Sequence, residues 1–180
     1  MNGRTKVAAL TAALLISAGA VGSAAASGDG DGGSTREAAS LTGTAKLYRP
    51  AGDDITFSFD AHLAAKDNKD PAKAYGTFRF SHYVNGKGGW AKAKVDCLMT
   101  GGKVAVVTGV VTDSDTPFKG KRVGVTVHDR GGHDRLGYSW ATGQDIEDVP
   151  RCLGSAPFEI VKAGTGDFAV LPWHPEYPTP

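Results

Sequence analysis

Alternation of apolar and polar residues with a period of two dominates the sequence from residue 41 to residue 171. The clearest run is 55–63, in which Ile, Phe, Phe, Ala and Leu alternate with Thr, Ser, Asp and His. Successive side chains of a β-strand point to opposite faces, so this run predicts a strand with one buried and one solvated face. We find no stretch with the 3.6-residue apolar period of an amphipathic helix.

The same alternation, interrupted by Gly, Pro, Asp and Asn, predicts further strands at 76–84, 90–99, 104–111, 123–127, 136–140, 158–161 and 168–171. A symmetric hairpin turn at the Gly101-Gly102 pair would place Cys97 opposite Val106, on the core side. Residues 104–111 are apolar on both parities, which predicts a central strand with both faces covered.

A second hairpin is predicted around the Gly131-Gly132 pair, where Val127 would face Leu136 across the strands. In this register Asp129 faces Asp134. Two carboxylates at such a short distance repel each other unless a hydrogen-bond donor or a cation lies between them. One solution is internal, with an arginine or turn amides as partners, and we expect Asp129 and Asp134 to order the corner in this way. The alternative is a bound calcium ion with Asp129 and Asp134 among its oxygen ligands.

Seven to nine strands at hairpin spacing predict an all-β fold, either an antiparallel β-sandwich or a small β-barrel. The pattern alone does not choose between the two. We assign residues 41–171 to a single β domain. Residues 172–180 form a Pro-rich tail that cannot enter the interior of a sheet, because proline lacks the amide hydrogen that a ladder requires.

The N-terminus carries the pattern of a cleavable signal peptide at residues 1–26. Arg4 and Lys6 precede an apolar run of 15 residues, 7–21, which is shorter than the ~20 that a membrane-crossing helix needs. Three alanines, 24–26, then supply a cleavage site. We therefore predict a secreted, extracellular protein without a membrane anchor after cleavage, starting at Ser27 with a flexible Gly, Asp and Ser leader over 27–40.

Charge and cysteine content agree with this compartment. The chain has 20 basic and 19 acidic residues, and cleavage would remove Arg4 and Lys6 and no acidic residue, so the mature charge is near zero. Nucleic-acid binding normally shows as a basic excess, so we expect no nucleic-acid partner. In an oxidising compartment the two cysteines, Cys97 and Cys152, are predicted to form a disulfide, the alternative being two buried thiols.

The succession FSFDAH, GTFRFSHY, VDCLMTGGKVAVVTGVV, VGVTVHDRGG and DRLGYSW resembles a family of small secreted bacterial β-domain proteins, some of which carry the name repetin. It is more distantly similar to the domain called post-COAP. The resemblance covers about residues 41–171 and implies secretion and a β fold. It carries no catalytic residue and no cofactor to this chain.

The sequence contains no pattern that we assign to catalysis. The segment 137–141, GYSWA, has Ala where a nucleophile elbow has its second Gly, and it lies within a predicted strand. The five histidines show none of the zinc-binding spacings, so we predict neither a catalytic residue nor a cofactor. Our leading hypothesis is a non-enzymatic module that binds an unknown extracellular partner or surface. The alternatives are a small-barrel hydrolase or isomerase, and a protease inhibitor that presents the loop 64–75.

Overall fold

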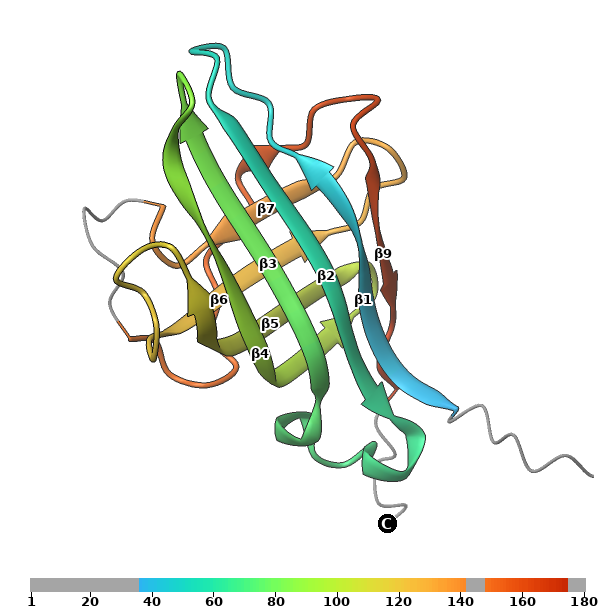
Figure 1. The fold of residues 1–180 in the computed structure, drawn as a ribbon. Helices are drawn as coiled ribbons and strands as arrows, with labels where there is room; N and C mark the ends of the chain where they lie inside the picture. The colour runs from blue at the N-terminus through green and yellow to red at the C-terminus, as the bar shows by residue number, and fades with distance from the viewer. Residues whose placement is uncertain (1–35, 142–147, 175–180) are drawn as a thin grey trace, which may run out of the picture. The chain divides into compact units, whose positions relative to one another are not determined.

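The computed structural model describes residues 36–141 and 148–174, and within them the chain forms one antiparallel sheet of nine strands in the order β8-β7-β6-β5-β4-β3-β2-β1-β9 (Figure 1). The strands are β1 (Glu37–Lys46), β2 (Asp54–Ala64), β3 (Tyr75–Val84), β4 (Lys87–Gly101), β5 (Val104–Ser114), β6 (Arg122–His128), β7 (Arg135–Tyr138), β8 (Glu159–Ile160) and β9 (Asp167–Leu171). The predicted all-β class and strand number are confirmed. No helix in this part of the chain has the length and apolarity that a membrane crossing requires.

The sheet curls until chain segments from its two sides meet. Leu47, just after β1, forms an isolated antiparallel bridge with Val161, just after β8. Beside the bridge, the amide of Tyr48 donates to the carbonyl of Ile160 at 2.7 Å. Figure 1 shows β1 to β4 on one side and β5 to β7 on the other. Because all nine strands belong to a single sheet, the architecture is the barrel-like one of the two that the sequence allowed.

Aromatic rings fill the interior between the two sides. They come from alternating inward positions of β2 and β3 and from β9, and they are Phe57, Phe59, Phe78, Phe80 and Phe168. Neighbouring rings pack with centroids 5.3 Å to 6.2 Å apart. Burial along β2 alternates as the sequence predicted, so the parity assigned to Phe57 and Phe59 is confirmed.

Strand β1 begins at Glu37, inside the segment 27–40 that the sequence analysis assigned to a flexible leader. That prediction was wrong for residues 37–40. Ala39 is fully buried, and β1 pairs with β2 on one side and with β9 on the other. The residues from Ala38 to Ser40 are small and show no apolar alternation, so only their two neighbouring strands identify them as a strand. The predicted signal peptide and residues 27–35 lie outside the described residues.

The β4–β5 hairpin also differs from its predicted register. Its turn is formed by residues 102–103, not 101–102, so Cys97 faces Thr108 and not Val106. A register shift between Val95 and Cys97 places the extra residue, Asp96, in β4. Such a bulge exchanges the two faces of a strand. Val95 before it and Leu98 after it belong to the core cluster, whereas Cys97 lies on the outer face of the sheet.

A segment that we call the strap, residues 148–158, covers the outer face of β5, β6 and β7. Two glycines make this close contact possible, because a Cβ atom on Gly124 would lie 2.0 Å from the carbonyl oxygen of Leu153, and one on Gly137 would lie 1.9 Å from that of Ala156. Thr108 of β5 is fully buried beneath the strap. The prediction that residues 104–111 have both faces covered is therefore confirmed at this position.

The remaining connections are short. Residues 64–75, considered above as an inhibitory loop, contain the 3-10 helices η1 (Ala65–Asp67) and η2 (Pro71–Lys73). Residues 172–174 follow β9 outside any strand, in agreement with the predicted tail. The side chain of Trp173 returns to this end of the barrel, where its indole nitrogen donates to the Asn68 carbonyl at 2.9 Å.

Candidate functional site

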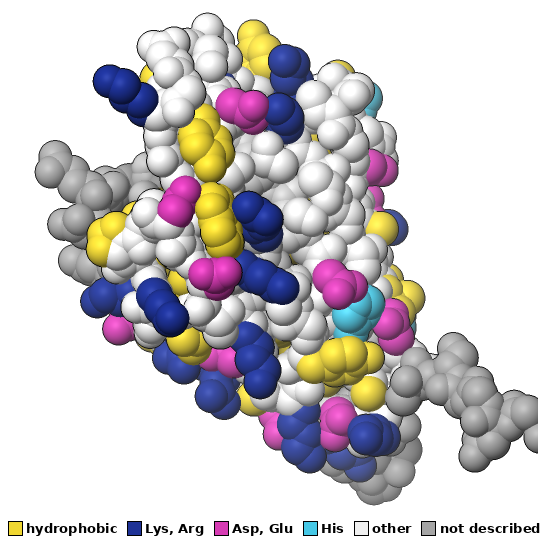
Figure 2. Space-filling view, viewed as in Figure 1, with side chains coloured by type: hydrophobic (Ala, Val, Ile, Leu, Met, Phe, Trp, Pro, Cys, Tyr) yellow, Lys and Arg dark blue, Asp and Glu magenta, His cyan; other side chains and the backbone are white. Residues whose placement is uncertain are grey.

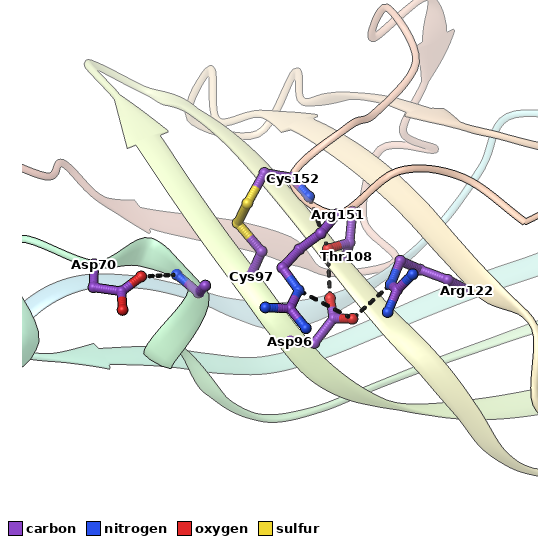
Figure 3. The surroundings of a disulfide bond; sticks show 8 residues. Asp70, Asp96, Cys97, Thr108, Arg122, Arg151 and Cys152 are labelled. Carbon is purple, nitrogen blue, oxygen red and sulfur yellow. Dashed lines mark hydrogen bonds and ion pairs between the residues drawn. A yellow bond between two sulfur atoms is a disulfide. The ribbon is translucent and has the colours of Figure 1, made fainter.

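Cys97 and Cys152 form a disulfide, as predicted, and it joins the strap to the outer face of β4 (Figure 3). Two polar contacts support this junction. The backbone amide of Cys152 donates to Thr108 Oγ1 at 3.1 Å, and the hydroxyl of Thr108 donates to Asp96 Oδ1 at 2.6 Å. Arg122 Nε also donates to the Asp96 carboxylate, at 2.6 Å. The disulfide is thus part of a structural attachment rather than a reactive site.

Asp129 and Asp134, the calcium candidates of the sequence analysis, hold strand β9. The amide of Val170 donates to Asp129 Oδ2 at 3.1 Å, and the amide of Phe168 donates to Asp134 Oδ2 at 2.8 Å. Turn amides supply further donors, among them Arg130 to Asp134 at 2.7 Å. The turn amides are among the internal partners that we expected for the pair, whereas the contacts from the amides of β9 were not foreseen. Strand β9 is the last strand of the sheet, and the two carboxylates accept hydrogen bonds that its amides would otherwise donate to a further strand.

The environments of the two aspartates shift their pKa values in opposite directions. Burial raises the pKa of Asp134, and the neighbouring Asp167 carboxyl acts in the same direction. Burial acts likewise on Asp129, but the hydrogen bonds from Lys103 and from the Val170 amide outweigh it and lower the pKa of that group. Among the described residues, no group of three or more His, Cys, Asp or Glu side chains is placed to hold a metal ion. Calcium binding by Asp129 and Asp134 stays an untested alternative.

Ser139, within the segment GYSWA, and His62, one of the five histidines, lie elsewhere in the fold. Ser139 Oγ accepts a hydrogen bond from the amide of Gly124 at 3.2 Å and so supports the contact between β6 and the end of β7. His62 lies on the outer face of β2, between the carboxylates of Glu37 (2.6 Å) and Asp60 (2.8 Å). The structure does not bring these two residues together.

An aromatic hollow at one end of the barrel is the best candidate for a binding site. It has a volume of about 280 Å³ and is lined by residues of β2 and β3 and by the end of β7 with the residues that follow it. We call it the mouth, and its lining residues are Ile55, Phe57, Phe80, Ser81, His82, Tyr138, Trp140 and Ala141. A neighbouring hollow of about 240 Å³ is lined mainly by charged side chains and lacks this group of aromatic rings.

The rings of the mouth form one continuous cluster. Trp140 is central to it, with ring centroids 4.4 Å from Phe80 and 4.9 Å from Tyr138. Phe57 lies below, 5.6 Å from Tyr138. Tilted rings at such separations pack favourably and present apolar surface, and Trp140 is only partly buried. A flat apolar ligand that enters the mouth would therefore contact this cluster.

An ion pair holds the wall of the mouth in place. Arg49, in the β1–β2 connection, donates to both carboxylate oxygens of Glu159 of β8, at 2.7 Å and 2.6 Å. The same guanidinium donates to the Tyr138 hydroxyl at 3.0 Å. Burial raises the pKa of Tyr138, so its hydroxyl is neutral at physiological pH. Since this hydroxyl accepts from Arg49, its own hydrogen can be donated to a ligand.

A second polar group lies at the rim. His82 Nε2 is 3.1 Å from Asp53 Oδ2, and its side chain is more than half exposed. The mouth thus combines a ring cluster with a few polar atoms at its edge, which is the usual composition of a small-molecule site. Sequence reasoning missed this arrangement because Arg49 and Glu159 are 110 residues apart and carry no local motif. Only the alternation around Tyr138 and Trp140 pointed to part of it.

Comparisons with protein-family models, with curated proteins and with solved structures gave no match to the chain. The resemblance to a family of small secreted bacterial β-domain proteins therefore stays a prediction.

Proposed function

We propose that the protein is an exported, extracellular binding module that holds a small, flat, apolar ligand in the mouth of the barrel. The observation that carries this proposal is the position of the ring cluster, which is partly exposed at the rim and lies directly above a filled interior. The cluster offers apolar contact surface, and the Tyr138 hydroxyl and His82 offer polar atoms that would orient a ligand.

The filled interior limits the size of the ligand. Phe57 and Phe59 occupy the space beneath the mouth, and both are almost completely buried. A long acyl chain would need the interior that these rings occupy. The volume of about 280 Å³ is also close to the lower end of ligand pockets, which is roughly 300 Å³. We infer a ligand of about one or two rings.

Export is supported by the signal-peptide pattern of residues 1–26 and by the disulfide, since disulfides persist in oxidising compartments. The intact mass of the protein recovered from the culture medium tests it. The expected species starts at Ser27. A major species that still contains residues 7–21 would contradict this part of the proposal.

Titration with indole tests the binding proposal, because indole is a flat, fragment-sized apolar ring. We expect the melting temperature to rise with indole concentration, as it must for a ligand that binds only the native state. The methyl resonances of Ile55 and Ala141, which line the mouth, should shift during the titration. Binding that leaves these resonances unchanged, or no stabilisation by indole or related one- and two-ring compounds, would overturn the proposal.

Two tryptophan variants provide a matched comparison. Trp140→Ala should abolish the stabilisation by indole, because Trp140 is central to the ring cluster. Trp90→Ala removes a side chain of the same size from the outer face of β4 and should leave the stabilisation intact. Trp140→Phe should retain part of the effect, since a ring remains at that position. Equal losses in the two alanine variants would argue against the mouth as the site.

The pair of His82 and Asp53 favours a second candidate function, acid–base catalysis on a ligand held against Trp140. An imidazole that is oriented by a carboxylate beside an apolar hollow can accept a proton at its other nitrogen. Turnover of p-nitrophenyl acetate that is lost in His82→Ala, and retained in the exposed control His133→Ala, would support this candidate. Equal rates in wild type and His82→Ala would exclude a catalytic role for His82 in this reaction.

A further inference from the structure

We propose a second binding site, separate from the mouth, on the outer face of β3 and β4, where Arg79, Lys92 and Lys94 form a cationic patch beside Trp90 that binds a linear anionic polysaccharide. Arg79 and Lys92 are direct cross-strand partners, and Thr77 faces Lys94 in the adjacent pair. All three cationic residues are exposed. Figure 2 shows Lys and Arg side chains beside apolar side chains over these strands, with acidic side chains next to them.

The charges of the three cations are not neutralised by close ion pairs with described residues, although Arg79 lies over the Trp90 ring and Lys92 faces Asp113 across β4 and β5. None of them lies within 4.0 Å of a described carboxylate, although Lys46, Lys103 and Arg122 do form such ion pairs. Like charges that face each other across two strands destabilise a sheet, and Arg79 faces Lys92. The fold therefore keeps an unfavourable pair at positions where a neutral polar residue would serve. An anion bound between the two strands would remove the repulsion.

Protection of a sheet edge does not explain the lysines. Lysine on an edge strand prevents pairing with other chains, but β3 and β4 each have a neighbouring strand on both sides. Lysine is also disfavoured in strand interiors by its β-propensity. Lys92 and Lys94 project from the same face about 6.7 Å apart, two residues along one strand. This arrangement provides a row of cations rather than a single charge.

Trp90 adds a flat ring to the patch. The guanidinium carbon of Arg79 lies 4.2 Å from the centroid of the Trp90 ring, in a cation–π contact. The backbone at Trp90 is held on both sides, because its amide donates to Asp115 Oδ1 at 2.6 Å and its carbonyl accepts from Ser114 Oγ at 2.8 Å. A partly exposed indole in a fixed position can stack against the face of a sugar ring.

Charge and ring together favour one class of ligand. A linear polysaccharide with carboxylate or sulfate groups presents both an apolar ring face and anions at regular intervals. Nucleic acid combines rings and anions as well, but proteins that bind it carry a basic excess, whereas this chain has a net charge of only +1. Acidic residues border the patch on both sides. Lys92 faces Asp113 of β5, and Thr77, the cross-strand partner of Lys94, faces Asp60 of β2, so the cations occupy a narrow band.

Binding to polygalacturonate and to heparin, measured by calorimetric titration, tests the proposal and distinguishes carboxylate from sulfate as the preferred anion. We expect at least one of them to bind, with an affinity that falls between about 50 mM and about 200 mM salt, as counterion release requires. Neutral dextran should not bind. Failure of both anionic polymers to bind, or tighter binding of single-stranded oligothymidylate, would overturn the proposal.

Two pairs of substitutions remove the same charge from different places. Lys92→Gln/Lys94→Gln should weaken binding about tenfold and make its salt dependence shallower, since two contacts with anionic groups of the polymer are lost. Lys66→Gln/Lys69→Gln removes two exposed cations from the segment around η1 and should change the affinity less than about twofold. Equal effects of the two pairs would mean that net charge, not the patch, controls binding.

Substitution of Trp90 tests the contribution of ring stacking separately from that of charge. Trp90→Ala should weaken binding about fivefold, while Trp90→Phe, which keeps a ring, should recover most of the loss. Melting temperatures of all variants show whether they are folded. A normal affinity in a folded Trp90→Ala variant would contradict the stacking role. These experiments do not depend on the mouth, because indole binding can be measured in the same variants.

Discussion

The two sides of the curled sheet differ in what lies outside them. On β2 burial alternates residue by residue, because the outer face of β1 to β3 and of the first part of β4 is open. On β6, the residues from Val123 to Val127 are all buried, since the strap covers the outer face there. On the open side only the inner face packs in the core, and the outer face is exposed and can contact a ligand. On the covered side both faces are packed.

The attachment of the strap explains why the outer face of β5 to β7 is covered. The disulfide and the contacts of Asp96 and Thr108 hold its first part, and the absence of side chains at Gly124 and Gly137 lets its backbone lie against the strands. On the open side, polar and charged side chains occupy the equivalent positions. A site such as the cationic patch is therefore possible only on the open side.

The largest expected effect tests the one-sided burial of β2. Phe57→Ala should lower the free energy of unfolding by about 3–5 kcal/mol, because it removes a buried ring from the centre of the core. The neighbouring Thr56→Ala, on the outer face, should cost less than about 0.5 kcal/mol. Chemical denaturation of both variants measures the difference. Equal losses would show that the two faces of β2 do not differ as described.

Removal of the disulfide should have the next largest effect, on the covered side. Cys97→Ser/Cys152→Ser opens a loop with a sequence separation of 55, and the chain-entropy model gives a loss of about 4 kcal/mol. Denaturant melts of the double variant, and of the wild type with reductant, should agree. Titration of thiols in the denatured, unreduced wild type should find none. Two reactive thiols would refute the bond.

A third prediction concerns the contact between strap and sheet. Gly124→Ala should cost about 1–3 kcal/mol, because the new Cβ atom would overlap the backbone of Leu153 and displace the strap. Gly101→Ala is the matched control, since nothing lies within 4 Å of a Cβ atom at that position. Thermal melts of the two variants measure the difference. A Gly124→Ala protein as stable as the control would mean that the strap can move away at little cost.

The smallest effect is a pH dependence on the open side. Burial disfavours the charged form of His62, but the hydrogen bond that its ring donates to Asp60 and the charge of Glu37 outweigh it, so the pKa of His62 is raised. The stabilisation by the protonated ring is fully present below about pH 6.5 and is lost as pH rises through the folded-state pKa. We expect less than about 1 kcal/mol, because the carboxylates are partly exposed.

Unfolding free energies measured between about pH 5.5 and pH 8.5 check this prediction. The His62→Gln variant should lose the pH dependence in this range, whereas His133→Gln, in the exposed β6–β7 turn, should keep it. A stability that rises with pH in wild type would have the wrong sign and would rule out the proposed role of His62.

Most strands could be predicted because their own residues alternate. The run 55–63 became β2, and the pairing of Val127 with Leu136 was correct because a short turn leaves few possible registers. Strand β1 was not among the predicted strands. Its residues 41–46 were assigned only to the β domain, and Ala39 and Ser40 are small, so that only β2 and β9 make them part of a sheet. The register around Cys97 was missed because a bulge at Asp96 cannot be seen in an alternation pattern.

The sequence by itself determined the fold class, the disulfide and which residues of most strands face the core, because these depend on composition and on a period of two. The tertiary structure alone decided the mouth, the strap and the cationic patch. Arg49 and Glu159 meet only because Leu47 pairs with Val161, and Arg79 faces Lys92 only because of the register of β3 on β4. Contacts between distant segments depend on how strands align and curl, and a local pattern carries no information about either.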